Sequence, residues 1–255
     1  MSAMKTKLLI CQSGAVSRGA RGSAHKAPAR AGFTLIELLI VIAVIGTLAA
    51  LLIPVFAGVT KHSLIYRAQS ERDQIETALE RYHTYYGFYP PGNASASANN
   101  LAPALTNQLY YELEGTTTNG SAAIAFTTLD SASTVAGTVL PSTFGPGVAG
   151  FMNYTKGSGE DLKNAENFFP GIKASQIASN GVVSVLVTSV SSDANYIPMP
   201  GFTTLAGRVA NPWRYLYPGV RNPSSYDLWI QIEVGGKTNL ICNWNSQAQI
   251  NPALP

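Results

Sequence analysis

The chain has 255 residues, of which 46% are hydrophobic and only 12% are charged. This length and composition indicate one medium-sized globular domain and an unusually apolar segment. The formal net charge is +3, but residues 1–32 hold six of the 17 Lys and Arg residues and no acidic residue. After Gly32, 11 basic residues face 14 acidic ones. A mildly acidic body argues against a basic surface for nucleic acid, and no nucleic-acid partner is predicted.

The apolar residues are concentrated in one segment, 33–53, which reads FTLIELLIVIAVIGTLAALLI and carries a single charge at Glu37. At about 1.5 Å per residue, a helix of this length crosses a hydrocarbon core of roughly 30 Å. We therefore predict a transmembrane helix over 33–53. The basic residues before it favour a cytoplasmic location for 1–32.

A conventional secretory signal or a lipoprotein signal fits the N-terminus poorly. Lys5 and Lys7 precede only four apolar residues, Leu8 to Cys11, which is too short a run for a secretory signal. Ile10 is too large for the position before a lipidated cysteine. Of the two cysteines, Cys11 lies in this segment. If it is removed with a leader, Cys242 remains without an intramolecular disulfide partner.

A plain signal anchor leaves Glu37 unexplained. A carboxylate inside an apolar span costs about 2.5–3.5 kcal/mol on insertion scales, so its presence requires a reason. Cleavage before Phe33 would create an α-amino group four residues from Glu37. That cation would neutralise the carboxylate in its own chain or in a neighbouring one.

The stretch from Gly32 through Phe33 to Glu37, followed by an apolar run, resembles the class III signal of type IV prepilins and of type II secretion pseudopilins. The resemblance implies that a prepilin peptidase cuts between Gly32 and Phe33 and that the new N-terminal Phe33 is methylated. It also implies that Glu37 aligns an incoming subunit with the N-terminus of one already in a filament. Gly46 and Pro54 lie where the family often has helix-softening residues, and Pro54 should kink the helix. The leader, 1–32, is longer than in many members of the family, so Met4 is an alternative start.

The helix is expected to continue as an amphipathic segment over 54–87. A stripe recurs at steps of three and four residues, while the other face is charged. Gly87 is a suitable C-terminal cap, and the following prolines prevent the helix from resuming. From 33 to 86 the helix would be roughly 80 Å long, as a filament subunit requires. The stripe comprises Ile65, Ala68, Arg72, Ile75, Leu79, Tyr82 and Tyr86, and the charged face comprises Glu71, Arg72, Asp73, Glu76, Glu80 and Arg81, with Arg72 at the edge between the two.

The head, 88–255, is expected to be an α+β domain with a small antiparallel sheet packed on the long helix, as in pilins. Residues 92–125 and 131–150 are rich in small residues and indicate surface loops, with one short helix within 101–113. Strands are predicted over 182–190 and 226–234. The pair Gly235-Gly236 predicts a two-residue hairpin turn into 240–244.

Two further stretches are similar to the major pseudopilin of type II secretion: ALERYHTYYGFYPP at 78–91, and a C-terminal region with Asn211-Pro212-Trp213, Tyr217-Pro218-Gly219 and Asn243-Trp244. The similarity implies a structural subunit of a protein-export machine, anchored in the bacterial inner membrane with a periplasmic head. The implied partners are copies of itself, other pseudopilins, prepilin peptidase, the inner-membrane assembly platform and the lipid bilayer.

Two departures separate the chain from that subfamily. Its members usually bind calcium in an acidic loop, whereas 233–239 here holds one acid, Glu233, and one base, Lys237. The calcium site is therefore not carried over and no cofactor is predicted, with calcium kept as an alternative although the usual acidic loop is absent. The segment 91–210 is also longer than in a compact major pseudopilin. A type IV pilus pilin or minor pilin, serving adhesion, motility or DNA uptake, and a binding module on a pilin anchor remain alternatives.

No catalytic constellation is visible, so an enzyme is not predicted. His62 and His83 are 21 residues apart and lack metal-binding spacing. His83 is expected to be a half-buried helix residue and Cys242 a residue of the strand core. The acidic pair Glu160-Asp161 is expected to be solvated. The aromatic residues Trp213, Tyr215, Tyr217, Tyr226 and Trp229 are expected to pack in the core.

Overall fold

The computed structural model describes residues 32–251 except 98–99, 119–123, 156–163, 191–200, 205–206 and 208–209, and it does not describe the side chains of 52–58. Residues 1–31 of the predicted leader, the Pro54 side chain and Glu160-Asp161 therefore lie outside the described part. The chain divides into two compact units, Met1–Leu51 and Leu52–Pro255.

The first helix, α1, spans Leu35–Tyr86 and contributes residues to both units. It begins two residues after the predicted start at Phe33 and ends at the predicted residue. The Gly87 N–H donates to the His83 carbonyl at 2.8 Å, and Gly87 has φ +82°. Because glycine adopts positive φ without a Cβ penalty, it terminates the helix here, as predicted.

The predicted apolar stripe of α1 is confirmed within the second unit. Ala68, Ile75, Leu79 and Tyr82 are fully buried and belong to the main core. The prediction for Glu71 is wrong, because this residue is only 5% exposed. Its carboxylate turns inward because hydroxyl and amide groups of residues 188–189 satisfy it.

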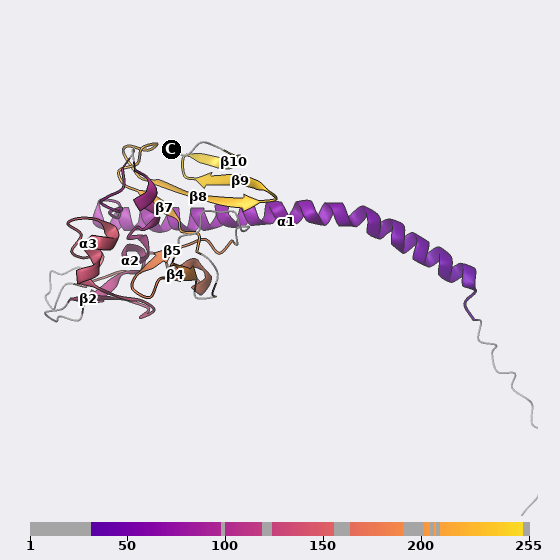
Figure 1. Cartoon of the computed structure of the whole chain (residues 1–255), viewed down its shortest axis with the longest axis horizontal. Coiled ribbons are helices and arrows are strands. Elements are labelled where there is room, and N and C mark those ends of the chain that lie inside the picture. The colour runs from indigo at the N-terminus through magenta and orange to yellow at the C-terminus, as the bar shows by residue number, and fades with distance from the viewer. Residues whose placement is uncertain are drawn as a thin grey trace, which may run out of the picture. The chain divides into compact units, whose positions relative to one another are not determined.

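The head contains three antiparallel sheets among its described residues, where the sequence predicted one. In Figure 1 the largest sheet is drawn along one side of α1, and α2, β4 and β5 on the other. The first sheet has the order β1-β2-β3, with β1 Thr116–Thr118, β2 Ala125–Thr128 and β3 Thr134–Ala136. The second has the order β5-β4-β6, with β4 Ile177–Ser179, β5 Ser184–Leu186 and β6 Thr203–Thr204. The third has the order β10-β9-β8-β7, with β7 Arg214–Leu216, β8 Asp227–Val234, β9 Lys237–Cys242 and β10 Asn245–Ile250.

The strand β8 is buried on both faces, although its sequence alternates. Leu228, Ile230 and Ile232 belong to the core that includes α1. Trp229, on the opposite face, packs in a second cluster with Leu240. The predicted hairpin is confirmed, because Val234 pairs with Lys237 across Gly235-Gly236. Both glycines have positive φ, as this turn requires.

The segments 92–125 and 131–150 were predicted to be mostly surface loops, and this is wrong for their helices. The predicted short helix is present as two pieces, a 3₁₀ helix, η1 (Ala102–Leu105), and α2 (Leu109–Glu114). Every residue of α2 is buried. Further along, η2 (Gly137–Val139) leads into α3 (Leu140–Phe144), whose Leu140 and Phe144 are fully buried, and η3 is Ala174–Gln176. Small residues lie between these buried helices, so the average composition did not indicate that the helices contribute to the core.

Candidate functional site

The strongest candidate site is the N-terminal end of α1, where Thr34 and Glu37 form reciprocal hydrogen bonds. The Thr34 N–H and hydroxyl both donate to Glu37 Oε2, each at 2.8 Å. The Glu37 N–H donates to Thr34 Oγ1 at 3.3 Å. This arrangement is a capping box, in which two backbone N–H groups at the helix start are satisfied by side chains. The sequence analysis missed it, although the Thr-x-x-Glu spacing is its signature.

The Gly32–Phe33 junction is free of packing contacts within the described part of the chain. Phe33 is 85% exposed, and a Cβ added at Gly32 would meet nothing within 4 Å. The same is true of Gly46, inside α1. The described residues therefore impose no steric requirement for glycine at position 32.

The rest of the first unit presents apolar side chains in all directions. Leu35 is 81% exposed, Ile42 60% and Leu51 71%, and the other large apolar residues between them are also exposed. The hydroxyl of Thr47 is satisfied within the helix, donating to the Val44 carbonyl at 2.8 Å. A helix that is apolar on every side must be covered by other apolar groups.

Within the part of the chain that the structure describes, no helix meets the length and hydropathy needed for a membrane span.

The residues considered for catalysis are placed in structural roles. His83 is half-buried and stacks on Tyr89 with ring centroids 4.3 Å apart, while His62 is exposed. Cys242 is fully buried in β9, and burial raises the pKa of its thiol. These findings confirm the predictions for His83 and Cys242. In the described ranges, no group of three or more His, Cys, Asp or Glu residues could hold a metal ion.

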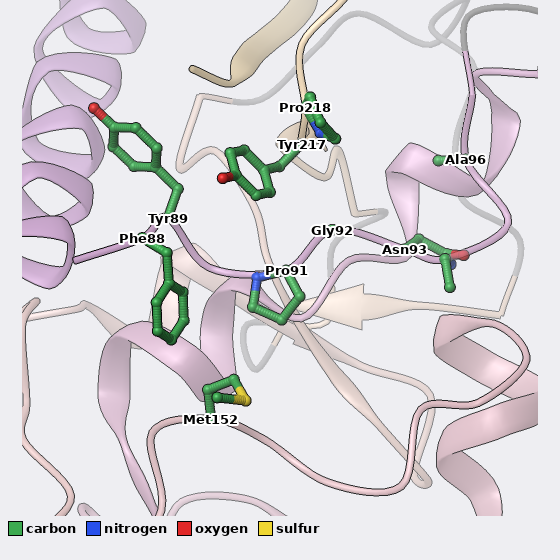
Figure 2. Close-up of a pocket in the computed structure, with 10 residues that line it drawn as sticks. Phe88, Tyr89, Pro91, Gly92, Asn93, Ala96, Met152, Tyr217 and Pro218 are labelled. Carbon is green, nitrogen blue, oxygen red and sulfur yellow. The ribbon is translucent and has the colours of Figure 1, made fainter. Parts of the chain in front are cut away.

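A cavity of about 580 Å³ lies in the second unit, beside the end of α1. Figure 2 shows Phe88, Tyr89 and Pro91, which follow α1, together with Tyr217 and Pro218, which follow β7. The ten residues that line it include no acid, no base and no thiol. The cavity is therefore suited to apolar contact and not to acid–base chemistry. Of the predicted core aromatic residues, Trp213, Tyr215, Tyr226 and Trp229 are buried, whereas Tyr217 lines this cavity.

A buried carboxylate, Glu112, joins α1 and α2 to residues 152–153. It accepts hydrogen bonds from the Tyr82 hydroxyl at 3.0 Å, the Met152 N–H at 2.8 Å and the Asn153 N–H at 2.9 Å. Burial raises the pKa of Glu112 to about 7, although these three hydrogen bonds act in the opposite direction. The group has no solvent exposure, so its role is in the stability of the head.

Comparison with known proteins gives matches to part of the chain. The family model of the prokaryotic N-terminal methylation motif matches residues 28–53. The type IV major fimbrial protein FimA of Dichelobacter nodosus is 51% identical over 49 residues, which cover 19% of this chain and 31% of FimA. A fimbrial protein of Pseudomonas aeruginosa is 50% identical over 52 residues, covering 20% of this chain and 34% of that protein.

A third relative matches over a longer stretch. The type IV major pilin protein PilE of Neisseria gonorrhoeae is 38% identical over 65 residues, covering 26% of this chain and 39% of PilE. The chain thus spans between 31% and 39% of the length of these three curated relatives. No solved structure matches the chain.

Proposed function

Because this chain carries the N-terminal segment of the type IV pilin and pseudopilin family, we propose that it is a structural subunit of a membrane-anchored filament. In this proposal a prepilin peptidase cuts between Gly32 and Phe33, and Phe33 becomes the methylated N-terminus. Segment 33–53 inserts in the inner membrane and later packs against copies of itself, with the head on the periplasmic side. The protein acts by assembly and not by catalysis.

One observation carries the proposal: the exposed apolar surface of 33–51 contains a single charged side chain, Glu37, near its start. An apolar helix of this kind gains free energy when lipid or other helices cover it, at about 25 cal/mol per Å² removed from water. A carboxylate in such an environment needs a cationic or hydrogen-bonding partner. A filament of parallel copies provides both the apolar cover and, at each processed N-terminus, an α-amino group.

The capping box describes the state from which assembly starts. In the single subunit, Glu37 is occupied by the amide and hydroxyl groups of Thr34. These hydrogen bonds already involve the charged carboxylate, but their donors are neutral. Pairing with the α-amino group of another subunit would give Glu37 a partner of opposite charge, and an apolar surrounding strengthens that attraction.

A type II secretion-like export machine is the first assignment within this class. It is supported by the similarity of 78–91 and of the Pro-Trp and Asn-Trp pairs at 212–213 and 243–244 to the major pseudopilin. A type IV pilus is the second assignment, favoured by the names of the relatives, which are fimbrial proteins and pilins. Neighbouring genes discriminate between them, since a secretin and a secretion ATPase favour the first and a retraction ATPase favours the second.

The test is N-terminal mass spectrometry of the membrane-extracted protein, combined with recovery of sheared filaments. We expect a mature wild-type chain that begins with methylated Phe33. Gly32→Ala should remain uncut, whereas Glu37→Ala should be cut but fail to enter filaments. Gly46→Ala is the matched control, because Gly46 also lacks close neighbours, and it should be cut normally. An uncut wild-type chain in a host with an active prepilin peptidase would contradict the proposal.

A further inference from the structure

The cavity beside the end of α1 is lined by aromatic rings that the head holds in place. Phe88, Tyr89 and Tyr217 are half-buried, and each packs against the main core. The Tyr89 ring lies edge-on to Tyr217, with centroids 5.9 Å apart, and to Tyr226 at 4.8 Å. The Tyr89 hydroxyl also donates to Glu80 Oε1 at 3.0 Å. The rings that line the cavity are therefore oriented before a ligand binds.

The rim of this cavity reaches the surface. Met152 is 44% exposed, Pro218 is exposed and Pro91 is half-buried. In Figure 2, Pro91 lies in the middle of the labelled residues, with Met152 on one side and Tyr217 and Pro218 on the other. The volume of about 580 Å³ falls within the range of roughly 300–1,000 Å³ that is usual for ligand pockets. The cavity is thus suited to an uncharged segment that enters from the surface.

A proline-containing extended segment has the chemistry that such a cavity accepts. Aromatic-lined grooves bind polyproline II segments, which are preformed and so lose little conformational entropy on binding. With three residues per turn, prolines three positions apart lie on the same side of this helix. Residues 252–255, which lie outside the described part, read Pro-Ala-Leu-Pro and carry no charged side chain. This chain therefore contains a suitable ligand for its own cavity.

The segment 252–255 is too short to reach the cavity of the same copy. The Asn251 N–H donates to the Thr238 carbonyl at 2.8 Å, close to the Gly235-Gly236 turn. That turn lies against α1 at Lys61, because a Cβ added at Gly235 would be 2.7 Å from Lys61 Nζ. The cavity adjoins the other end of α1, 25 residues or roughly 37 Å beyond Lys61. Four extended residues span at most about 14 Å.

We propose that residues 252–255 of one copy dock in this cavity of a second copy. The inference rests on the proposed function, in which copies assemble with parallel helices. When one head follows another along that direction, the end that carries Asn251 meets the end that carries the cavity. The contact joins two different surfaces, so it can repeat from copy to copy without closing and thus extend a filament.

The first test is binding of a labelled synthetic peptide, Asn-Pro-Ala-Leu-Pro, to the full chain in detergent micelles. The receptor chain carries Pro252→Ala and Pro255→Ala, so that its own segment does not compete. We expect a saturable rise in fluorescence anisotropy. A peptide with alanine in place of both prolines should bind about tenfold more weakly, because it is not preorganised. Failure of the first peptide to bind would overturn the proposal.

A matched pair of receptor variants locates the binding. Met152→Glu places a charge at the rim of the cavity and should weaken peptide binding about tenfold. Val182→Glu makes the same change in the turn between β4 and β5, where Val182 is 48% exposed, and should bind as the unchanged receptor does. Both side chains are exposed, so both variants should fold. Equal affinities for the two variants would overturn the assignment to this cavity.

The second test asks whether a second copy is the occupant. Met152→Cys and Leu254→Cys are combined with Cys11→Ser, and sheared filaments are treated with a short bis-maleimide. We expect a ladder of dimers, trimers and larger species, because each copy offers both a segment and a cavity. Either cysteine alone should yield monomers, since Cys242 is buried.

The two tests separate failure of this inference from failure of the proposed function. Filaments without a ladder would overturn the docking and leave the proposed function intact. Peptide binding without a ladder would assign the cavity to a proline-containing segment of another protein and would likewise overturn docking between copies. A wild type that forms no filaments contradicts the proposed function, and crosslinking is then scored between copies in micelles, where monomers alone would overturn the docking.

Discussion

The Thr188 hydroxyl donates a 2.6 Å hydrogen bond to the Glu71 carboxylate, although 117 residues separate the two in sequence. The Ser189 N–H donates to the same carboxylate at 3.1 Å, and the Ser189 hydroxyl donates as well. The Arg67 guanidinium lies 3.8 Å from it on the exposed side. Glu71 therefore fastens α1 to the segment that follows β5.

Replacing Glu71 with alanine should destabilise the head strongly. The change removes the acceptor for three donors and leaves buried hydroxyl and amide groups unpaired, which costs about 1–3 kcal/mol for each buried group left unsatisfied. We expect a loss of about 2–4 kcal/mol in the free energy of unfolding, measured by chemical denaturation in detergent micelles. Gln74→Ala, an exposed change one turn away, should stay within about 0.5 kcal/mol. Equal losses for both variants would show that the Glu71 contacts contribute nothing.

Stability should fall as pH rises from 5 to 8, in part because of Glu112. Its pKa is about 7 in the folded head against an ordinary value of 4.5, so the folded state retains a proton that the unfolded chain releases. The stabilisation is complete below the unfolded pKa and is lost as pH rises through the folded one. At about 1.4 kcal/mol per pKa unit, the loss of this stabilisation lowers the free energy of unfolding by up to about 3 kcal/mol.

This pH dependence is measured as the change in the denaturation midpoint over a series of pH values with EDTA present. Glu112→Gln should make it shallower, whereas Glu80→Gln, at an exposed position on α1, should leave it unchanged. A steeper or unchanged slope in Glu112→Gln would mean that Glu112 is ionised in the folded head.

Two kinds of sequence pattern predicted their elements well: hydrophobic periodicity and paired glycines at a turn. The stripe through Ala68, Ile75 and Leu79 has the period of a helix, and the pair Gly235-Gly236 has few uses other than a tight turn. These signals are local, so no knowledge of distant contacts was needed. The N-terminal motif is local too, which is why its family could be named from residues 32–37.

The features that the sequence did not predict depend on distant partners. Glu71 lies among charged residues on α1, and only Thr188 and Ser189 explain why it is buried. The strand β10 follows Asn243-Trp244, a turn without glycine that gives a weak signal. The wholly buried α2 is six residues long and is surrounded by small polar residues, so its core position follows from packing and not from pattern.

Removing the Thr34 hydroxyl should loosen the start of α1. Thr34→Val keeps the side-chain shape but loses one bond to Glu37 and the acceptor for the Glu37 N–H. Loss of an N-cap group costs about 1 kcal/mol, so amide exchange at Glu37 should accelerate about fivefold in micelles. Thr34→Ser retains the hydroxyl and should exchange at the wild-type rate. Equal exchange rates in the wild type and Thr34→Val would indicate that the capping box is not formed in the isolated subunit.

Two glycines in one loop should respond very differently to alanine. Both Gly145 and Gly147 have positive φ, +105° and +84°, so alanine strains the backbone at either position. At Gly145 the added Cβ would also lie 2.8 Å from the Ala94 Cβ and 2.9 Å from the Ser95 nitrogen, whereas at Gly147 it would meet nothing within 4 Å. Backbone strain alone costs about 1 kcal/mol, and overpacking adds about 1–3 kcal/mol.

Gly145→Ala should therefore lower the free energy of unfolding by about 2–4 kcal/mol, and Gly147→Ala by about 1 kcal/mol, in denaturation measured side by side. The Ala94 N–H donates to the Phe144 carbonyl at 2.8 Å, so segment 94–95 is held against the loop and has little freedom to move away. Gly145 also has ψ 163°, a conformation that is essentially restricted to glycine, so backbone strain and the steric contacts both make its variant the more destabilised of the two. Losses of equal size would show that segment 94–95 yields to the added methyl group without cost.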